Sequence, residues 1–120
     1  MSALAKVSTV VIDCGDPVRL AEFYSKVTGW EVTHSGEDLA SLGSGEPFGL
    51  AFVRIEGYRA PSWPDDAKHV HLDFTVADLE EAVGRILALG ASRPEFQPGK
   101  DQWVVLTDPE GHPFCITTGA

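Results

Sequence analysis

The stretch that decides the fold is HVHLDFTVADLEEAV, residues 69–83. Its first eight residues alternate between polar and apolar side chains, which is the pattern of a half-buried β-strand. Asp78 follows and can cap a helix, because its carboxylate accepts free amide hydrogens of a first helical turn. Apolar residues then recur at helical spacing up to Leu89, and Gly90 suits a left-handed helix end. We therefore predict a strand over residues 69–76 followed directly by a helix.

The same order of elements occurs earlier in the chain. The sequence VVIDCGDPV, residues 10–18, matches LDFTVADLE, residues 72–80, at an offset of 62, with Asp16 in the position of Asp78. Each copy reads as a strand, a helix and about three further strands. We therefore predict an α+β fold made of two βαβββ modules.

We assign the whole chain, residues 1–120, to one domain. The first module is expected over residues 7–56, a connector rich in Pro and Gly over 57–68, and the second module over 69–118. The first helix is expected to run from Asp16 to about Thr28. The predicted strands span 7–14, 30–34, 39–42 and 48–55, then 69–76, 93–96, 102–107 and 114–118.

The composition excludes several classes of function. The chain of 120 residues is 43% hydrophobic and 22% charged, which is typical of a globular protein rather than a disordered one. It has 9 Lys and Arg against 18 Asp and Glu, a net charge of −9, which disfavours nucleic acid and anionic membrane surfaces. No membrane span or signal peptide is visible. We expect a cytoplasmic protein whose cysteines, Cys14 and Cys115, stay reduced.

One face of the strand predicted over 69–76 carries the best candidates for chemistry. Its alternate residues are apolar and are expected to pack under the helix. Polar side chains on the second face of an interior strand usually line water or a cleft. Four residues share this face: His69, His71, Asp73 and Thr75.

The duplicated module, with HVHLDFTVADLEEAV and then WVVLTDPEGHPFCI at residues 103–116, resembles the vicinal oxygen chelate superfamily. Within it, the chain is most similar to the small glyoxalase-like and bleomycin resistance-like proteins, from about Val7 to Thr118. The resemblance implies two paired curved sheets with clefts on their concave faces, and a homodimer whose interface completes the clefts. The superfamily includes isomerases, lyases, dioxygenases and metal-free drug binders, so the fold alone does not give the function.

The resemblance also implies where a metal would bind, with one ligand on the opening strand and one on the closing strand of each module. These positions correspond to Thr9, His71 and Cys115, whereas the candidates over residues 49–53 of the first closing strand have no ligand atoms. A catalytic divalent metal generally takes about three protein ligands. We therefore predict no cofactor and no catalytic residue, with a divalent metal held through His71 as the alternative.

The leading interpretation is a metal-free protein that captures a small molecule. Aromatic side chains provide stacking area for an aromatic or polycyclic apolar ligand, such as a natural-product antibiotic, and resistance would follow from its sequestration. The net negative charge favours a neutral or cationic ligand. The predicted ligand-binding residues are Thr9, Phe48, Phe52, Trp63, His71, Asp73, Trp103 and Cys115.

Other interpretations remain open. The protein could be a metal-dependent lyase, isomerase or dioxygenase of the vicinal oxygen chelate type, with His71 as general base or metal ligand. Cys115 could act as a nucleophile if His71 served as its base, although a free Cys is most simply a small buried hydrophobe. The cleft could also be vestigial in a subunit or sensor. The segment DPEG, residues 108–111, is explained as a turn before any ligand contact is invoked.

Overall fold

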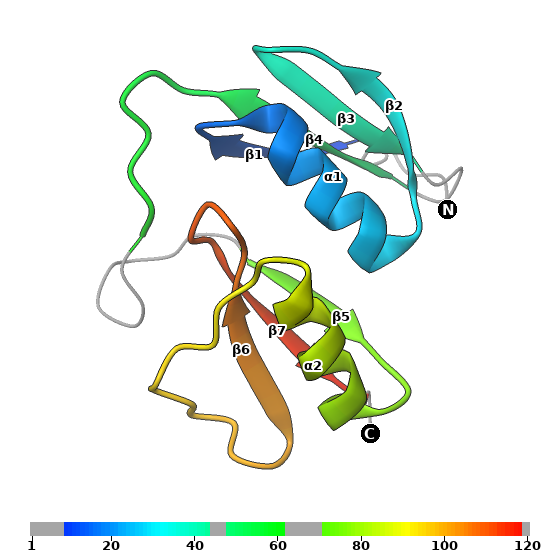
Figure 1. The fold of residues 1–120 in the computed structure, drawn as a ribbon, viewed down its shortest axis with the longest axis vertical. Helices are drawn as coiled ribbons and strands as arrows, with labels where there is room; N and C mark the ends of the chain where they lie inside the picture. The colour runs from blue at the N-terminus through cyan, green and yellow to red at the C-terminus, as the bar shows by residue number, and fades with distance from the viewer. Residues whose placement is uncertain (1–8, 44–47, 62–70, 119–120) are drawn as a thin grey trace, which may run out of the picture. The chain divides into compact units, whose positions relative to one another are not determined.

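The computed structural model describes residues 9–43, 48–61 and 71–118 (Figure 1). The chain divides into two compact units, Met1–Arg59 and Ala60–Ala120, and the boundary falls inside the segment expected to connect the modules. The elements in chain order are β1 (Thr9–Cys14), α1 (Pro17–Thr28), β2 (Glu31–Ser35), β3 (Leu39–Gly43), β4 (Gly49–Arg54), β5 (Leu72–Thr75), α2 (Leu79–Ala88), β6 (Trp103–Thr107) and β7 (Pro113–Thr117). This is the predicted α+β class.

The first unit is a mixed sheet with α1 across one face (Figure 1). The strand order is β1-β4-β3-β2, in which β1 runs parallel to β4 and β3 is antiparallel to both of its neighbours. The helix contributes Leu20 and Tyr24 to the core, and β4 contributes Phe52, all of them almost completely buried. The rings of Tyr24 and Phe52 stack with centroids 5.6 Å apart and planes 5° from parallel.

Helix α1 begins and ends where the sequence predicts. The Asp16 side chain accepts a hydrogen bond from the backbone N–H of Arg19 at 3.2 Å, and Pro17 occupies the first turn. Gly29 ends the helix in the left-handed region at φ 77°.

Helix α2 has the equivalent start and a different end. Asp78 accepts a hydrogen bond from the backbone N–H of Glu81 at 3.0 Å, as predicted. The C-cap is Leu89, so Gly90 lies one residue beyond the cap, still with a positive φ of 116°. Among the described residues, no helix is both long enough and apolar enough to cross a membrane.

The second unit is a three-stranded sheet with the order β5-β7-β6. β5 runs parallel to β7, and β7 is antiparallel to β6. Val104 and Ile116 are partners across β6 and β7 and are both buried, and Val104 lines a depression together with Leu79 and Val83 of α2. This face therefore lies toward α2, and the alternate residues of the three strands lie on the opposite face.

The strand predicted over residues 93–96 is wrong. In the described part of the second unit, residues 93–96 form no strand, and the isolated bridge between Ser92 and Thr107 lies just before them. The side-chain amide of Gln97 takes the place of a neighbouring strand. Its Nε2 donates to the backbone oxygen of Val105 and its Oε1 accepts from the Val105 N–H, both at 2.9 Å. Because the amide satisfies the edge of β6, no further strand is needed there.

Candidate functional site

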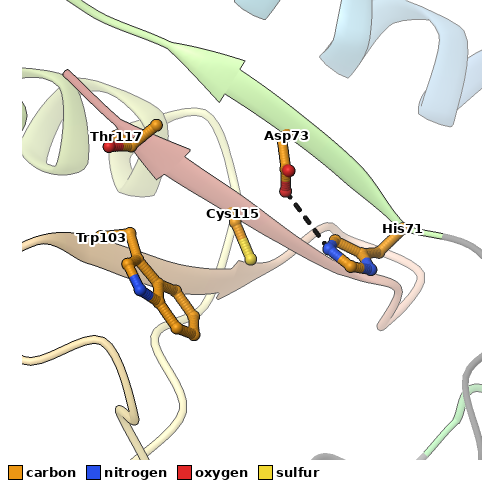
Figure 2. A pocket seen from close by; sticks show the side chains of 5 residues that line it. All are labelled: His71, Asp73, Trp103, Cys115 and Thr117. Carbon is orange, nitrogen blue, oxygen red and sulfur yellow. Dashed lines mark ion pairs between the residues drawn. The ribbon is translucent and has the colours of Figure 1, made fainter. Parts of the chain in front are cut away.

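A pocket of about 260 Å³ lies in the second unit, on the face of the sheet opposite α2 (Figure 2). All of its lining residues come from the three strands or their immediate ends. They are His71, Asp73, Trp103, Cys115 and Thr117. Figure 2 shows their side chains projecting from β5, β6 and β7 toward one open space.

The strand register explains why these residues meet. Asp73 is the direct partner of Cys115 across β5 and β7, and Trp103 is the partner of Thr117 across β6 and β7. Residues two apart on a strand share a face, which brings His71 to the side of Asp73 and Thr117 to the side of Cys115. The pocket thus contains four predicted ligand-binding residues. Thr117 was not predicted, although its spacing of two from Cys115 was a sufficient signal.

His71 and Asp73 lie side by side in the pocket and form an ion pair when the imidazole is protonated. His71 Nε2 lies 3.2 Å from Asp73 Oδ1, and the two side chains are 50% and 69% exposed (Figure 2). A carboxylate beside an imidazole fixes the orientation of the ring. Because both side chains stay accessible, either one can form a hydrogen bond to a bound molecule.

Cys115 is a protonated thiol in this environment. Burial, the negative charge of the nearby Asp73 carboxylate and a hydrogen bond between the thiol and Asp73 together raise the pKa of Cys115 from 9.0 to about 11. A nucleophilic cysteine needs the opposite, a lowered pKa. The surroundings of Cys115 therefore disfavour the nucleophilic pairing with His71 and make the thiol a weakly polar wall of the pocket.

The same residues also have the donor atoms of a metal site. Ligand atoms of His71, Asp73 and Cys115 all lie within 4.8 Å of one another, and no other such group occurs among the described residues. Nitrogen, oxygen and sulfur donors suit a borderline metal such as zinc. Ligands around tetrahedral zinc are about 3.3–3.8 Å apart, so only a pair separated by nearly 4.8 Å would have to close by about 1 Å. The three donor atoms are of the kinds that bind a metal ion. The Cys115 thiol would have to lose its proton to act as a ligand.

Two further predicted residues belong to the first unit. Thr9 is exposed at the start of β1, where its partner across the sheet is Gly49. Phe48 is half-buried and packs edge-on against Trp30, with ring centroids 6.2 Å apart. Trp63, predicted as a ligand-binding residue, and His69 lie outside the described residues.

The prediction that Phe52 binds the ligand is wrong. Its side chain is 0% exposed and lies in the core against Tyr24, so it has no surface to offer a ligand. The reason is the strand alternation. Ala51 and Val53 share one face of β4, and Phe52 must lie on the other, which α1 covers.

The turn predicted at residues 108–111 is confirmed, and it sets the register of β6 and β7. The Asp108 side chain is buried and accepts from the backbone N–H of Glu110 at 2.8 Å and of His112 at 3.0 Å. Its other oxygen lies 2.7 Å from His112 Nδ1. Gly111 closes the turn at φ 93°. These contacts fix the hairpin that places Trp103 opposite Thr117.

The fold and the polar strand face define a member of the vicinal oxygen chelate superfamily. The family model of the glyoxalase-like domain matches residues 9–117, and the chain belongs to this family. No curated protein matches the sequence significantly.

Solved structures with similar folds cover nearly the whole chain. A glyoxalase/bleomycin resistance protein/dioxygenase family enzyme from Burkholderia phytofirmans PsJN is 24% identical, with a TM-score of 0.71 over 93% of this chain and 97% of that one. TioX from Micromonospora sp. ML1 is 19% identical, with a TM-score of 0.63 over 97% and 100%. Oxidase ChaP-H2 is 18% identical, with a TM-score of 0.66 over 98% and 96%. At these identities the likeness shows the fold.

Proposed function

We propose that this protein binds a small planar aromatic molecule, neutral or cationic, in the pocket of the second unit, without a metal and without turnover. The observation that carries the proposal is one pocket that joins the indole of Trp103 to the His71–Asp73 pair. An aromatic wall beside a few orienting polar groups is the usual composition of a small-molecule site.

The energetics favour a cationic or electron-poor ring. A well-placed aromatic pair contributes about 0.5–1.5 kcal/mol beyond burial, and a cation over an indole contributes a similar amount. The Asp73 carboxylate and the net charge of −9 attract positive charge to the same region. A volume of about 260 Å³ is near the lower end for ligand pockets and suits one or two fused rings.

The chemistry of the pocket favours binding over covalent catalysis. Cys115 holds its proton at neutral pH because its pKa is about 11, so the pocket lacks an activated sulfur nucleophile. Capture of a planar natural product, with protection by sequestration, is the biological use that we propose for such a site.

The proposal is tested by titrating the protein with N-methylquinolinium, a two-ring aromatic cation, in a calorimeter. We expect saturable binding that weakens by about tenfold in Trp103→Leu, the loss of roughly one aromatic stack. Trp30→Phe, a change of the same residue type in the first unit, should leave the dissociation constant unchanged. Equal affinity in Trp103→Leu and the wild type would overturn the proposed site.

A second candidate function, a metal-dependent lyase, isomerase or dioxygenase, is favoured by the convergence of His71, Asp73 and Cys115. Elemental analysis after incubation with Zn(II), Ni(II), Fe(II) or Mn(II) discriminates between the two. A stoichiometric metal that is lost in His71→Ala and retained in His34→Ala, an exposed histidine of β2, would favour the enzyme. No retained metal under any condition would favour the binding protein.

A further inference from the structure

The indole of Trp103 lies directly on Gly99. Gly99 is buried, and a Cβ atom at this position would overlap Trp103 Cδ2, lie 2.6 Å from Trp103 Cε2 and lie 2.5 Å from the backbone oxygen of Trp103. These two atoms form the bond shared by the two rings of the indole, so the Gly99 backbone covers the middle of one ring face. The opposite face is therefore the one that remains for a molecule in the pocket.

The turn that contains Gly99 is held in a strained conformation. Gln102 donates its backbone N–H to the Gly99 oxygen at 2.9 Å, which closes the turn just before β6. Lys100, inside the turn, has φ 53° and is the only non-glycine residue with a positive φ in the described part of the chain. A non-glycine residue in this region is strained and persists only where the surroundings hold it.

Gln97 fixes the same segment to β6 from the other side. Its amide pairs with both backbone groups of Val105, two residues beyond Trp103, and donates to the Pro94 oxygen at 2.9 Å. The chain between Gln97 and Gln102 is thus attached to β6 at Val105 and packed against it at Trp103. The indole has little freedom to move away from the pocket.

We infer that Gly99 is a positioning residue that sets the place of the Trp103 ring and thereby the width of the pocket. This inference rests on the proposed function and adds the feature that selects flat ligands. A side chain at Gly99 would press on both the indole and the backbone oxygen of Trp103, and the indole, as the part not held in the sheet, would move toward the space that a ligand would occupy. Gln97 holds the turn against β6, so the displacement cannot be absorbed by the loop.

The test compares Gly99→Ala with Gly84→Ala, which adds the same methyl group on α2 with no atom within 4 Å. Fluorescence is measured in Trp30→Phe/Trp63→Phe protein, where Trp103 is the only tryptophan, and probe binding is measured with each glycine change in the otherwise wild-type chain. We expect Gly99→Ala to shift the emission maximum of Trp103, alter its quenching by acrylamide and weaken N-methylquinolinium binding by about tenfold. Gly84→Ala should change none of these. Unchanged emission and quenching in Gly99→Ala would overturn the inference.

A double-mutant cycle separates positioning from a general structural effect. If Gly99 acts through the indole, Gly99→Ala should weaken probe binding much less in Trp103→Leu protein than in protein that retains Trp103. An equal loss in both backgrounds would contradict positioning. If Gly99→Ala fails to fold, Gln97→Ala replaces it in the test. We expect Gln97→Ala to increase the quenching of Trp103 by acrylamide and to weaken probe binding. No change in either measurement would contradict the inference.

The inference and the proposed function fail in different ways. If the wild-type protein does not bind the probe, the proposed function is wrong. The emission and quenching of Trp103 still decide whether Gly99 positions the ring. If that protein binds the probe and Gly99→Ala binds it equally well, the proposed function stands and the role of Gly99 in the pocket is wrong.

Discussion

Asp73 and Cys115 are direct partners across the parallel strands β5 and β7, so a carboxylate and a thiol occupy neighbouring places on the same open face. The carboxylate raises the pKa of Cys115 beyond the effect of burial. The pair therefore keeps the sulfur protonated while it provides a negative charge close to the Trp103 ring. This arrangement suits recognition of a cationic or hydrogen-bond-donating ring better than attack on a substrate.

We predict slow alkylation of Cys115. Because its pKa is raised from 9.0 to about 11, its thiolate fraction near pH 8 should be about a hundredfold below that of an unperturbed thiol. Reaction with iodoacetamide, followed by mass spectrometry of the peptide that contains Cys115, measures the rate. Asp73→Asn should accelerate the reaction several-fold, because it removes the negative charge, whereas Asp13→Asn in β1 should not. Rapid alkylation of wild-type Cys115 would contradict this account.

Cys115 should also destabilise the fold in alkaline solution. Its pKa in the folded protein is about 11, above the ordinary value of 9.0, so the unfolded chain releases the proton first as pH rises. The contribution to stability is fully present below about pH 9 and is lost between about pH 9 and about pH 11. Urea unfolding across this interval should show a steeper fall for the wild type than for Cys115→Ala. Parallel curves would indicate that the thiol has an ordinary pKa.

We predict that Phe52 contributes strongly to the stability of the fold. Phe52→Ala should lower the free energy of unfolding by about 3–5 kcal/mol, because the ring is fully buried against Tyr24. Phe96→Ala is the matched control, since Phe96 is 52% exposed and the same truncation should cost much less. Urea unfolding measures both. A loss in Phe52→Ala as small as that in Phe96→Ala would show that the ring is not in the core.

Asp108 is predicted to hold the hairpin between β6 and β7. Asp108→Ala should lower the free energy of unfolding by about 2–4 kcal/mol, because it leaves the N–H groups of Glu110 and His112 without their acceptor. Asp101→Ala, at an exposed position of another turn, should have little effect. Thermal unfolding checks both variants. Equal melting temperatures for Asp108→Ala and the wild type would contradict the role of the carboxylate.

Local patterns in the sequence were enough to predict most of the fold. The Asp residues before each helix and the alternation in the opening strands depend on interactions within a few residues, which a linear sequence displays. The same alternation placed His71 and Asp73 on one polar face. The placement of Cys115 beside them depended on the resemblance to the family, and Trp103 was predicted only as an aromatic residue available for stacking, because periodicity does not give the order of strands in a sheet.

The errors arose where a single side chain replaced a regular element or where alternation was applied inconsistently. The 93–96 segment contains Pro94, which cannot donate to a strand ladder, and the Gln97 amide pairs with the edge of β6 in its place. Phe52 was predicted to line the cleft because it is aromatic. Strand alternation puts Ala51 and Val53 on one face of β4 and therefore places Phe52 on the opposite face, which α1 covers. Gly99 could not be recognised in advance, because its role depends on the position of the Trp103 ring in space.

The most direct test of the central claim is calorimetric titration of EDTA-treated wild-type protein with N-methylquinolinium. The account predicts saturable binding at one site per chain, with the same affinity before and after addition of Zn(II). No binding, or binding that appears only after Zn(II) is added and disappears in His71→Ala, would contradict metal-free recognition of an aromatic ligand in this pocket.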